Sequence, residues 1–266
     1  MVRDDGDGMD AWNQADAYEP YVGRWSRLLA PRFLAWTGWR GGEVVDVGCG
    51  TGALSQAPLA GGATRLAGFD LSASYVRQSR AAMGSLRARF EVGDAQRLPL
   101  PDASFDAAMS GLVLNFVPEP ARMLREMRRV VRPGGLVALY VWDYGGKMEM
   151  IRAFWDAAVA LDPQARALDE GRRFPVCRPE ALEALAREAG LREVTSAAID
   201  QPTLFGDFDD YWTPFLGGQG PAPGYCASLA PAARDALRER LRASLPTMVD
   251  GRIPLVARAW AVRGRV

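Results

Sequence analysis

Short apolar segments alternate with amphipathic ones through the middle of the chain. Runs such as VVDV, FDAAMSGLVL and LVALYVW have the length and composition of buried strands. Residues 120–132 have helical periodicity instead, with Leu124, Met127 and Val131 on one stripe and with Arg122, Arg125 and Arg129 away from it on a solvated face. Strands that alternate with helices from residue 43 to residue 143 predict an α/β fold with a doubly wound parallel sheet.

The first apolar run leads into a glycine turn, VVDVGCGTG, residues 44–52. The strand carries Asp46 near its end, Gly48, Gly50 and Gly52 alternate after it, and a segment of helical composition follows. Glycines there let the backbone turn tightly and approach a ligand closely. The spacing differs from the G-x-G-x-x-G fingerprint of dinucleotide sites, and a carboxylate beside the turn attracts a cation rather than a phosphate. The turn therefore predicts S-adenosylmethionine as the ligand.

Two further strand ends carry groups that suit the adenosine half of this ligand. Asp70 ends a second strand just over twenty residues after the turn, where an acid can accept both ribose hydroxyls. Asp94 and Ala95 end a third strand, and a carboxylate next to a backbone N–H can bond the amino group and ring nitrogen of adenine. The segment SGLVLNFVPEP closes a fourth strand, and LREMRRVVRPGGLVALYVWD supplies a helix, a Pro-Gly-Gly turn and a fifth strand.

Together these segments, residues 40–145, resemble the class I S-adenosylmethionine-dependent methyltransferases, in the small-molecule branch that includes the ubiquinone and menaquinone methyltransferases. The resemblance implies a seven-stranded, mostly parallel Rossmann-like sheet with an antiparallel last strand, and helical lid elements. VTSAAI is expected as the sixth strand and IPLVARAWAVRG as the seventh. The cofactor contacts it implies are Asp46, Gly48, Cys49, Gly50, Gly52, Asp70, Leu71, Asp94, Ala95 and Leu112.

Each of these contacts has a structural alternative. Asp46 can be a helix-capping acid instead of a partner for the methionine ammonium, which is the role of its counterpart in the family. Asp70 can cap the helix that starts near Ser72, and Asp94 can be an ordinary turn residue. Cys49 is expected to lend its backbone rather than a nucleophilic thiol, and Leu112 to line the methionine arm.

The segments outside the sheet predict a lid. Residues 1–8 read as a disordered tail, and residues 9–37 as two aromatic, amphipathic helices hinged near Pro20. The resemblance implies that such a helix closes over the cofactor, where Tyr21 or Arg24 reaches the methionine carboxylate; alternatively the helix packs on the sheet with Arg24 in solvent. The expected domains are a helical lid (1–37), a cofactor-binding domain (38–200 and 251–266) and a helical cap (201–250). Long insertions of this kind are usually functional.

Three residues are candidates for a catalytic role. Asp143 and Tyr144 follow the fifth strand, at the sheet edge where open α/β sheets place substrates. Asp143 is the best-placed base in a chain without histidine, and Tyr144 can assist it; alternatively Asp143 caps the following helix. Many relatives carry histidine in a segment like LHHVPDP where this chain has Asn115, in LNFVPEP. Asn115 cannot remove a proton but can orient a substrate oxygen.

Composition narrows the function further. The 266 residues include no histidine, which excludes histidine bases and histidine metal ligands, and no metal is expected. Lys plus Arg and Asp plus Glu are 32 each, so nucleic acid is not an expected partner. No apolar stretch has the length of a membrane span, and the three scattered cysteines, Cys49, Cys177 and Cys226, suit a reducing cytoplasm.

The leading hypothesis is therefore methyl transfer from S-adenosylmethionine to O, N or C of a small, partly apolar molecule. The alternatives are an NAD-dependent Rossmann oxidoreductase and a non-catalytic S-adenosylmethionine-binding partner protein. The oligomeric state is left open.

Overall fold

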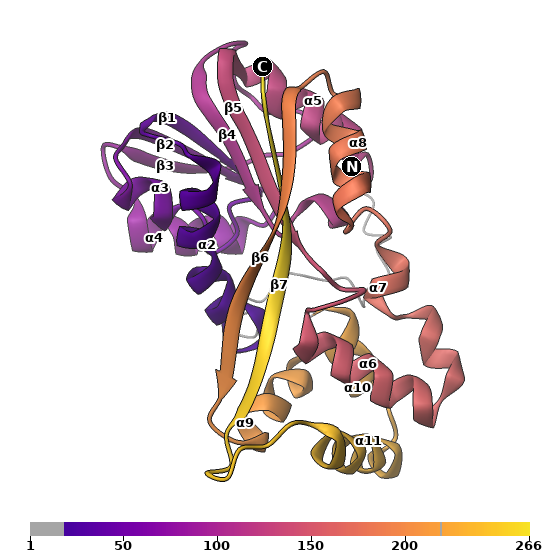
Figure 1. The fold of residues 1–266 in the computed structure, drawn as a ribbon. Coiled ribbons are helices and arrows are strands. Elements are labelled where there is room, and N and C mark those ends of the chain that lie inside the picture. Colours follow the sequence, from indigo (N-terminus) through magenta and orange to yellow (C-terminus); the bar gives the residue numbers. More distant parts are fainter. Residues whose placement is uncertain (1–18, 219) are drawn as a thin grey trace. The chain divides into compact units, whose positions relative to one another are not determined.

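The computed structural model describes residues 19–218 and 220–266 (Figure 1). Seven strands form one sheet in the order β3-β2-β1-β4-β5-β7-β6. β1 pairs in parallel with β2 and β4, β2 with β3, and β4 with β5, whereas β7 runs antiparallel to β5. The strands are β1 (Gly42–Val47), β2 (Ala63–Asp70), β3 (Ala88–Val92), β4 (Phe105–Gly111), β5 (Val131–Trp142), β6 (Arg192–Phe205) and β7 (Ile253–Arg265). The predicted fold class is confirmed.

Helices occupy the connections between the strands. In the first half they are η2 (Glu19–Gly23, a π-helix), α2 (Arg24–Thr37), α3 (Gln56–Ala60), α4 (Ala73–Met83), η3 (Leu114–Phe116) and α5 (Pro120–Val130). In the second half they are α6 (Glu149–Leu161), η4 (Pro163–Ala167), α7 (Glu170–Arg173), α8 (Pro179–Glu188), α9 (Phe208–Trp212), η5 (Thr213–Gly217), α10 (Pro221–Ser228) and α11 (Pro231–Ser244). None of the described helices is long and apolar enough to cross a membrane.

The chain divides into two compact units. The sheet unit comprises residues 26–142, 176–199 and 259–266, and the helical unit comprises residues up to Trp25, 143–175 and 200–258. The helical unit thus takes in residues 143–175, which the sequence analysis placed with the sheet. The reason is aromatic packing, because Phe154 of α6 stacks on Phe215 of η5 with ring centroids 4.5 Å apart, and both side chains are fully buried.

The core of the sheet unit follows from the apolar strands. Val44, Val45, Ala107 and Ala108 on the adjacent strands β1 and β4 have no solvent exposure, as expected for a sheet covered on both faces. In α5 the predicted stripe is buried through Leu124 and Met127, together with Met123 and Val130. Arg122 and Arg125 are about half exposed, as predicted, whereas Arg129 is 30% exposed because it pairs with Glu126 and Asp102. In Figure 1, α5 and α8 lie side by side.

Element boundaries differ from the predictions in three places. The Pro-Gly-Gly segment belongs to β5, because Val131 already pairs with Phe105, and α5 therefore ends at Val130 instead of Arg132. β6 continues past VTSAAI to Phe205. Of the two N-terminal helices, α2 is present and a π-helix precedes it at Pro20, while residues 9–18 lie outside the described part of the chain.

Candidate functional site

The glycine turn after β1 is shaped by backbone geometry that favours glycine. Gly48, Gly50 and Gly52 all have positive φ, at +74°, +51° and +88°. A Cβ atom at Gly48 would overlap Val113, and one at Gly52 would overlap Met83, so these two positions are closed to side chains. A Cβ at Gly50 would meet nothing within 4 Å. The turn is therefore tightly packed at both ends and leaves its middle open to a ligand.

Asp46 is a buried acid directly before this turn, with 1% of its surface exposed. Its Oδ2 accepts a hydrogen bond of 2.5 Å from Ser55 Oγ, whereas its Oδ1 is buried and has no partner among the described residues. Burial raises the pKa of Asp46 to about 7, against the lowering effect of the Ser55 hydrogen bond. Buried acceptors are nearly always hydrogen-bonded, so the orphaned oxygen is a candidate acceptor for a ligand's hydrogen-bond donor.

Asp70, at the end of β2, connects the turn to the next helix. Its Oδ2 accepts a 2.9 Å hydrogen bond from the Gly50 amide, and its Oδ1 accepts one of 2.8 Å from the Ser72 amide. Burial raises the pKa of Asp70, while these two amides lower it. The cap of α4 is Ser72, whose hydroxyl accepts from Tyr75 N, so Asp70 itself is not the capping residue. A carboxylate has about four acceptor sites, so two remain for a ribose diol.

The end of β3 is less distinctive. Asp94 Oδ1 accepts hydrogen bonds from the backbone and side-chain nitrogens of Gln96, at 2.8 and 3.3 Å, as expected of a turn residue. Asp94 and Ala95 are both half-buried, and Leu71, beside Asp70, is 71% exposed. The contacts of these three residues with adenosine stay predictions.

The end of β4 carries two unusual features. Leu112 has φ +65°, a conformation that is strained for a non-glycine residue, and its amide donates to Tyr140 O at 2.8 Å. Three residues on, both amide atoms of Asn115 are buried without a partner among the described residues. β1 and β4 are neighbours at the point where strand order reverses, which is where open α/β sheets bind ligands. The unpartnered groups of Asp46 and Asn115 therefore make this edge the candidate ligand site.

Four of the predicted site residues lie in the helical unit rather than in the sheet unit: Tyr21, Arg24, Asp143 and Tyr144. Arg24 Nη1 donates to Asp210 Oδ1 at 2.7 Å, and its guanidinium lies over the rings of Trp25 and Phe205. The carboxylate that Arg24 binds in the structure is thus one from the protein. Tyr21 is buried and meets Phe215 edge-on at 5.4 Å. The roles of Tyr21 and Arg24 toward a cofactor stay predictions.

The two acid–base candidates after β5 are both largely buried. Asp143 Oδ2 accepts from the Lys147 amide at 2.9 Å, so its carboxylate holds the turn that leads into α6. The cap position of that helix is Met148, not Asp143. Tyr144 packs its ring against Phe174 at 5.5 Å. Catalytic roles for both residues stay predictions.

Ser55 is a site residue that the sequence analysis missed. It lies in the helical-looking run ALSQAPLA, and the pattern of that run shows nothing of the hydrogen bond to Asp46. A serine placed to satisfy one oxygen of a buried acid follows from tertiary contact alone. Among the described residues, no group of three or more Cys, Asp or Glu side chains is arranged to hold a metal ion.

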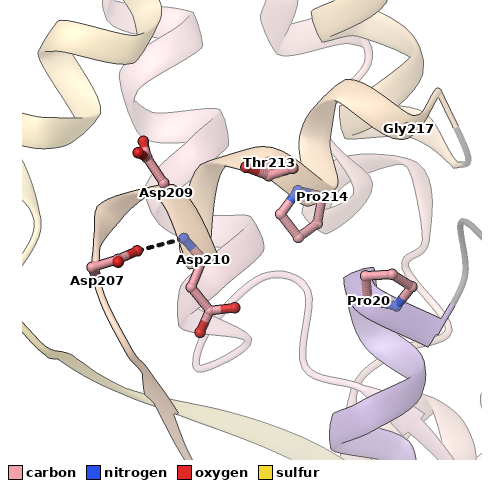
Figure 2. Close-up of a pocket in the computed structure, with 7 residues that line it drawn as sticks. All are labelled: Pro20, Asp207, Asp209, Asp210, Thr213, Pro214 and Gly217. Carbon is pink, nitrogen blue, oxygen red and sulfur yellow. Dashed lines mark hydrogen bonds between the residues drawn. The ribbon is translucent and has the colours of Figure 1, made fainter.

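The helical unit also holds a cavity of about 520 Å³ that the sequence did not indicate. Figure 2 shows its lining residues, which are Pro20, Asp207, Asp209, Asp210, Thr213, Pro214 and Gly217. Its three acids already have partners: Asp210 binds Arg24, Asp209 binds Arg238, and Asp207 accepts from the Asp210 amide. The cavity is therefore a poor candidate for a cation site.

Comparison with known proteins identifies a family. Residues 45–139 match the model of a methyltransferase domain. The chain is 30% identical to 2-methyl-6-phytyl-1,4-hydroquinone methyltransferase of Synechocystis sp., over 68% of this chain and 56% of that protein. It is 34% identical to demethylmenaquinone methyltransferase of Roseiflexus castenholzii, over 58% of this chain and 69% of that protein. The chain thus spans little more than half the length of some of its curated relatives.

Solved structures show the same fold. Phosphoethanolamine N-methyltransferase 2 of Haemonchus contortus, in complex with S-adenosyl-L-methionine, has a TM-score of 0.61 at 15% identity, covering 100% of this chain and 61% of that one. A putative methyltransferase of an antibiotic biosynthesis pathway in Anabaena variabilis has a TM-score of 0.60 at 18% identity, covering 90% and 97%.

Replacing Asp70 with alanine is expected to weaken binding of S-adenosylhomocysteine. Two charge-assisted hydrogen bonds to the ribose would be lost, which corresponds to about 2–4 kcal/mol, or roughly 30-fold or more in Kd. Calorimetric titration measures the loss, and circular dichroism checks the fold. Asp102→Ala is the control, because Asp102 is a surface acid, 79% exposed, in the same unit. An unchanged Kd in a folded Asp70→Ala protein would rule out the ribose role.

Binding of S-adenosylhomocysteine is expected to strengthen as pH rises from 5.5 to 8. Asp46 is mostly protonated below its raised pKa of about 7, and the ligand's ammonium favours the ionised form, so binding below pH 7 must release a proton. The dependence amounts to about tenfold per pH unit well below 7. Calorimetry in two buffers of different ionisation enthalpy measures the released proton.

The variant Asp46→Asn is expected to bind weakly and with little pH dependence. It also provides a stability check. Because the pKa of Asp46 is raised in the folded state, the folded protein holds this proton more tightly than the unfolded chain does. The resulting stabilisation is complete at a pH below 3.8, the pKa of the unfolded chain, and is lost as the pH rises through 7. The free energy of unfolding of the wild type should therefore fall relative to Asp46→Asn between pH 4 and pH 8. A parallel pH dependence in both proteins would show that Asp46 does not titrate in this range.

Proposed function

Since this chain belongs to the class I S-adenosylmethionine-dependent methyltransferases, we propose that it transfers the cofactor's methyl group to O, N or C of a small, partly apolar molecule. One observation carries the proposal most directly. The orphaned Oδ1 of Asp46 lies beside the open middle of a positive-φ glycine turn, next to Asp70 at the end of the neighbouring strand. These carboxylate acceptors fit a ligand with an ammonium group and a ribose.

The residues present fit the cofactor at three of its polar groups. Asp46 would receive the methionine ammonium, Asp70 the ribose hydroxyls, and Asp94 with the Ala95 amide the adenine edge. When bound, S-adenosylmethionine supplies a methyl group on a sulfonium that is already a strong electrophile. The protein therefore mainly has to align the acceptor and exclude water.

The acceptor side of the reaction needs little machinery. Asn115 offers both an amide donor and an amide acceptor that the described protein leaves unused, so it can orient an acceptor oxygen or nitrogen. Asp143 and Tyr144 are the candidates for removing a proton from the acceptor. A metal is not required by this scheme.

The size and polarity of the acceptor are suggested by the relatives and by the insert. The relatives named above are called methyltransferases of a hydroquinone and of demethylmenaquinone. The insert contributes a buried aromatic set, Phe205, Tyr211, Trp212, Phe215 and Tyr225. Aromatic side chains suit an acceptor with an apolar part. We place the reaction in the cytoplasm, where the three free cysteines stay reduced. We expect no nucleic-acid partner, because the net charge of the chain is zero.

A nicotinamide-dependent oxidoreductase is the less favoured function. The acid in front of the turn would repel a pyrophosphate, and the relatives named above are methyltransferases. A non-catalytic binding protein would keep the cofactor site but transfer nothing.

Label transfer tests the proposal. The protein is incubated with methyl-tritiated S-adenosylmethionine and a metabolite extract, and labelled product is followed by chromatography. We expect transfer that persists in EDTA and is lost in Asp70→Ala, with Asp102→Ala unaffected. Calorimetry with NAD runs in parallel. Micromolar NAD binding without a response to the adenosyl ligands would contradict the proposal, and restoration of EDTA-abolished transfer by magnesium would contradict its metal-free chemistry.

The lid hypothesis gives a separate expectation. The N-terminal segment through Trp25 and residues 201–250 are expected to gain protection from hydrogen exchange when S-adenosylhomocysteine and acceptor bind, because an uncovered sulfonium would admit water. Mass spectrometry of the exchanged peptides measures this, with peptides of α8 as the internal control. Unchanged exchange in both segments would exclude a lid.

A further inference from the structure

Ser55 occupies the position directly before α3, where a serine hydroxyl ordinarily caps a helix. Its hydroxyl makes no hydrogen bond to the amides of that helix. It donates instead to Asp46 Oδ2 at 2.5 Å, and at most 1% of the surface of either residue is exposed. The side chain of Ser55 therefore serves the buried acid and not the helix that it precedes.

This hydrogen bond makes the two oxygens of Asp46 different. Oδ2 accepts from the hydroxyl, whereas Oδ1 is buried and has no partner in the part of the chain that the structure describes. The backbone of Asp46 is held between two strands, since it pairs with Gly68 of β2 on one side and with Met109 of β4 on the other. The sheet thus fixes the backbone of Asp46, and the hydroxyl of Ser55 fixes its carboxylate.

The other surroundings of Asp46 disfavour its charge. Burial raises its pKa to about 7, the Ser55 hydrogen bond opposes this, and the charge of Asp70 on β2 adds to the rise. Cys49, in the glycine turn, is the other titratable neighbour, and burial raises the pKa of its thiol, which stays uncharged at neutral pH. No described arginine or lysine forms an ion pair with Asp46. Among the described groups that act on Asp46, the Ser55 hydroxyl is therefore the one that favours the ionised form.

Resting on the methyl transfer proposed above, we infer that Ser55 is a positioning residue of the cofactor site, which holds Asp46 Oδ2 so that the charged Oδ1 meets the methionine ammonium. A hydrogen bond to a carboxylate stabilises the ionised form over the neutral acid. In the free protein below pH 7 the proton of Asp46 lies on Oδ1, because Oδ2 accepts from Ser55. The ammonium takes the place of this proton, which is released to water.

Removal of the hydroxyl is expected to weaken binding of S-adenosylhomocysteine most at acidic pH. Without the charge-assisted hydrogen bond, the pH midpoint of binding in Ser55→Ala should move upward by about one pH unit. Only the ionised acid pairs with the ammonium. The variant should therefore bind roughly tenfold more weakly than the wild type at pH 6 and within about twofold of it at pH 8.5.

Proton release gives a second readout. Calorimetry in two buffers of different ionisation enthalpy should detect about half a proton released per ligand at pH 7 in the wild type, because the pKa of Asp46 is about 7, and close to one proton in Ser55→Ala. The probe 5′-methylthioadenosine keeps the adenosine but has no ammonium. Its binding should release no proton and should be equal in the two proteins.

Ser79→Ala is the matched control. Ser79, on α4, is likewise fully buried and donates to the glycine turn at 2.8 Å, but its acceptor is the backbone oxygen of Gly50. Its loss can weaken binding at every pH but should move neither the pH midpoint nor the proton count. Asp46→Asn is the second background, in which the added change Ser55→Ala should have no pH-dependent effect.

Circular dichroism checks the fold of each variant. If Ser55→Ala does not fold, Ser55→Cys takes its place, since a thiol is only a weak donor and should move the midpoint in the same direction. An equal loss of affinity at all pH values, an unchanged proton count, an equal loss for 5′-methylthioadenosine, or a pH-dependent loss that persists in the Asp46→Asn background would overturn the inference.

These outcomes are distinct from failure of the proposed function. Normal binding of S-adenosylhomocysteine by the wild type, with no change of pH midpoint in Ser55→Ala, would remove the role of Ser55 and leave methyl transfer standing. Absence of S-adenosylhomocysteine binding in the wild type would refute the methyltransferase function itself.

Discussion

The carboxylate of Asp70 holds the candidate cofactor site of the sheet unit together. One oxygen accepts the amide of Gly50 in the middle of the glycine turn, and the other accepts the amide of Ser72 where α4 begins. These two bonds link the connection after β1 to the connection after β2. They hold the turn in positive-φ geometry, so the backbone stays open at Gly50. The ligand contacts that we propose for Asp46, Leu112 and Asn115 depend on this turn.

Two buried acids with raised pKa values occur in different units and in different surroundings. Asp46 lies in a polar turn with a serine partner, and burial brings its pKa to about 7. Glu170 lies among aromatic rings with an indole partner, and burial brings its pKa to about 8. In both cases one oxygen is satisfied by a neutral donor, and no described cation pairs with the acid. Perturbed acids of this kind concentrate at functional sites. The ligand group that we propose for Asp46, an amino-acid ammonium, would compensate its buried charge.

In the helical unit, arginine side chains form ion pairs with three other acids. Arg24 neutralises Asp210, Arg152 neutralises Asp169, and Arg238 neutralises Asp209. These pairs are part-exposed or accompanied by further hydrogen bonds, and each leaves no charge to compensate. Glu170 stands apart from this pattern because Arg152, the cation of the preceding residue, is engaged by Asp169 through two hydrogen bonds.

Local chemistry along the chain was enough to predict the fold class, the glycine turn and the strand that ends at Asp70. Apolar runs of strand length, glycine spacing and an acid at a strand end are properties of neighbouring residues, and they determine backbone conformation before any long-range contact forms. Tertiary contact decided the rest. Ser55 became the partner of Asp46, the Pro-Gly-Gly segment joined β5 by pairing next to Phe105, and residues 143–175 joined the helical unit through the stacking of Phe154 on Phe215. Glu170 gave no signal in the sequence, because an acid in a short helix is ordinary until folding buries it. Burial and hydrogen-bond partners depend on residues distant in the chain, so the pKa of an acid and its capacity to bind a cation are decided only in the folded protein.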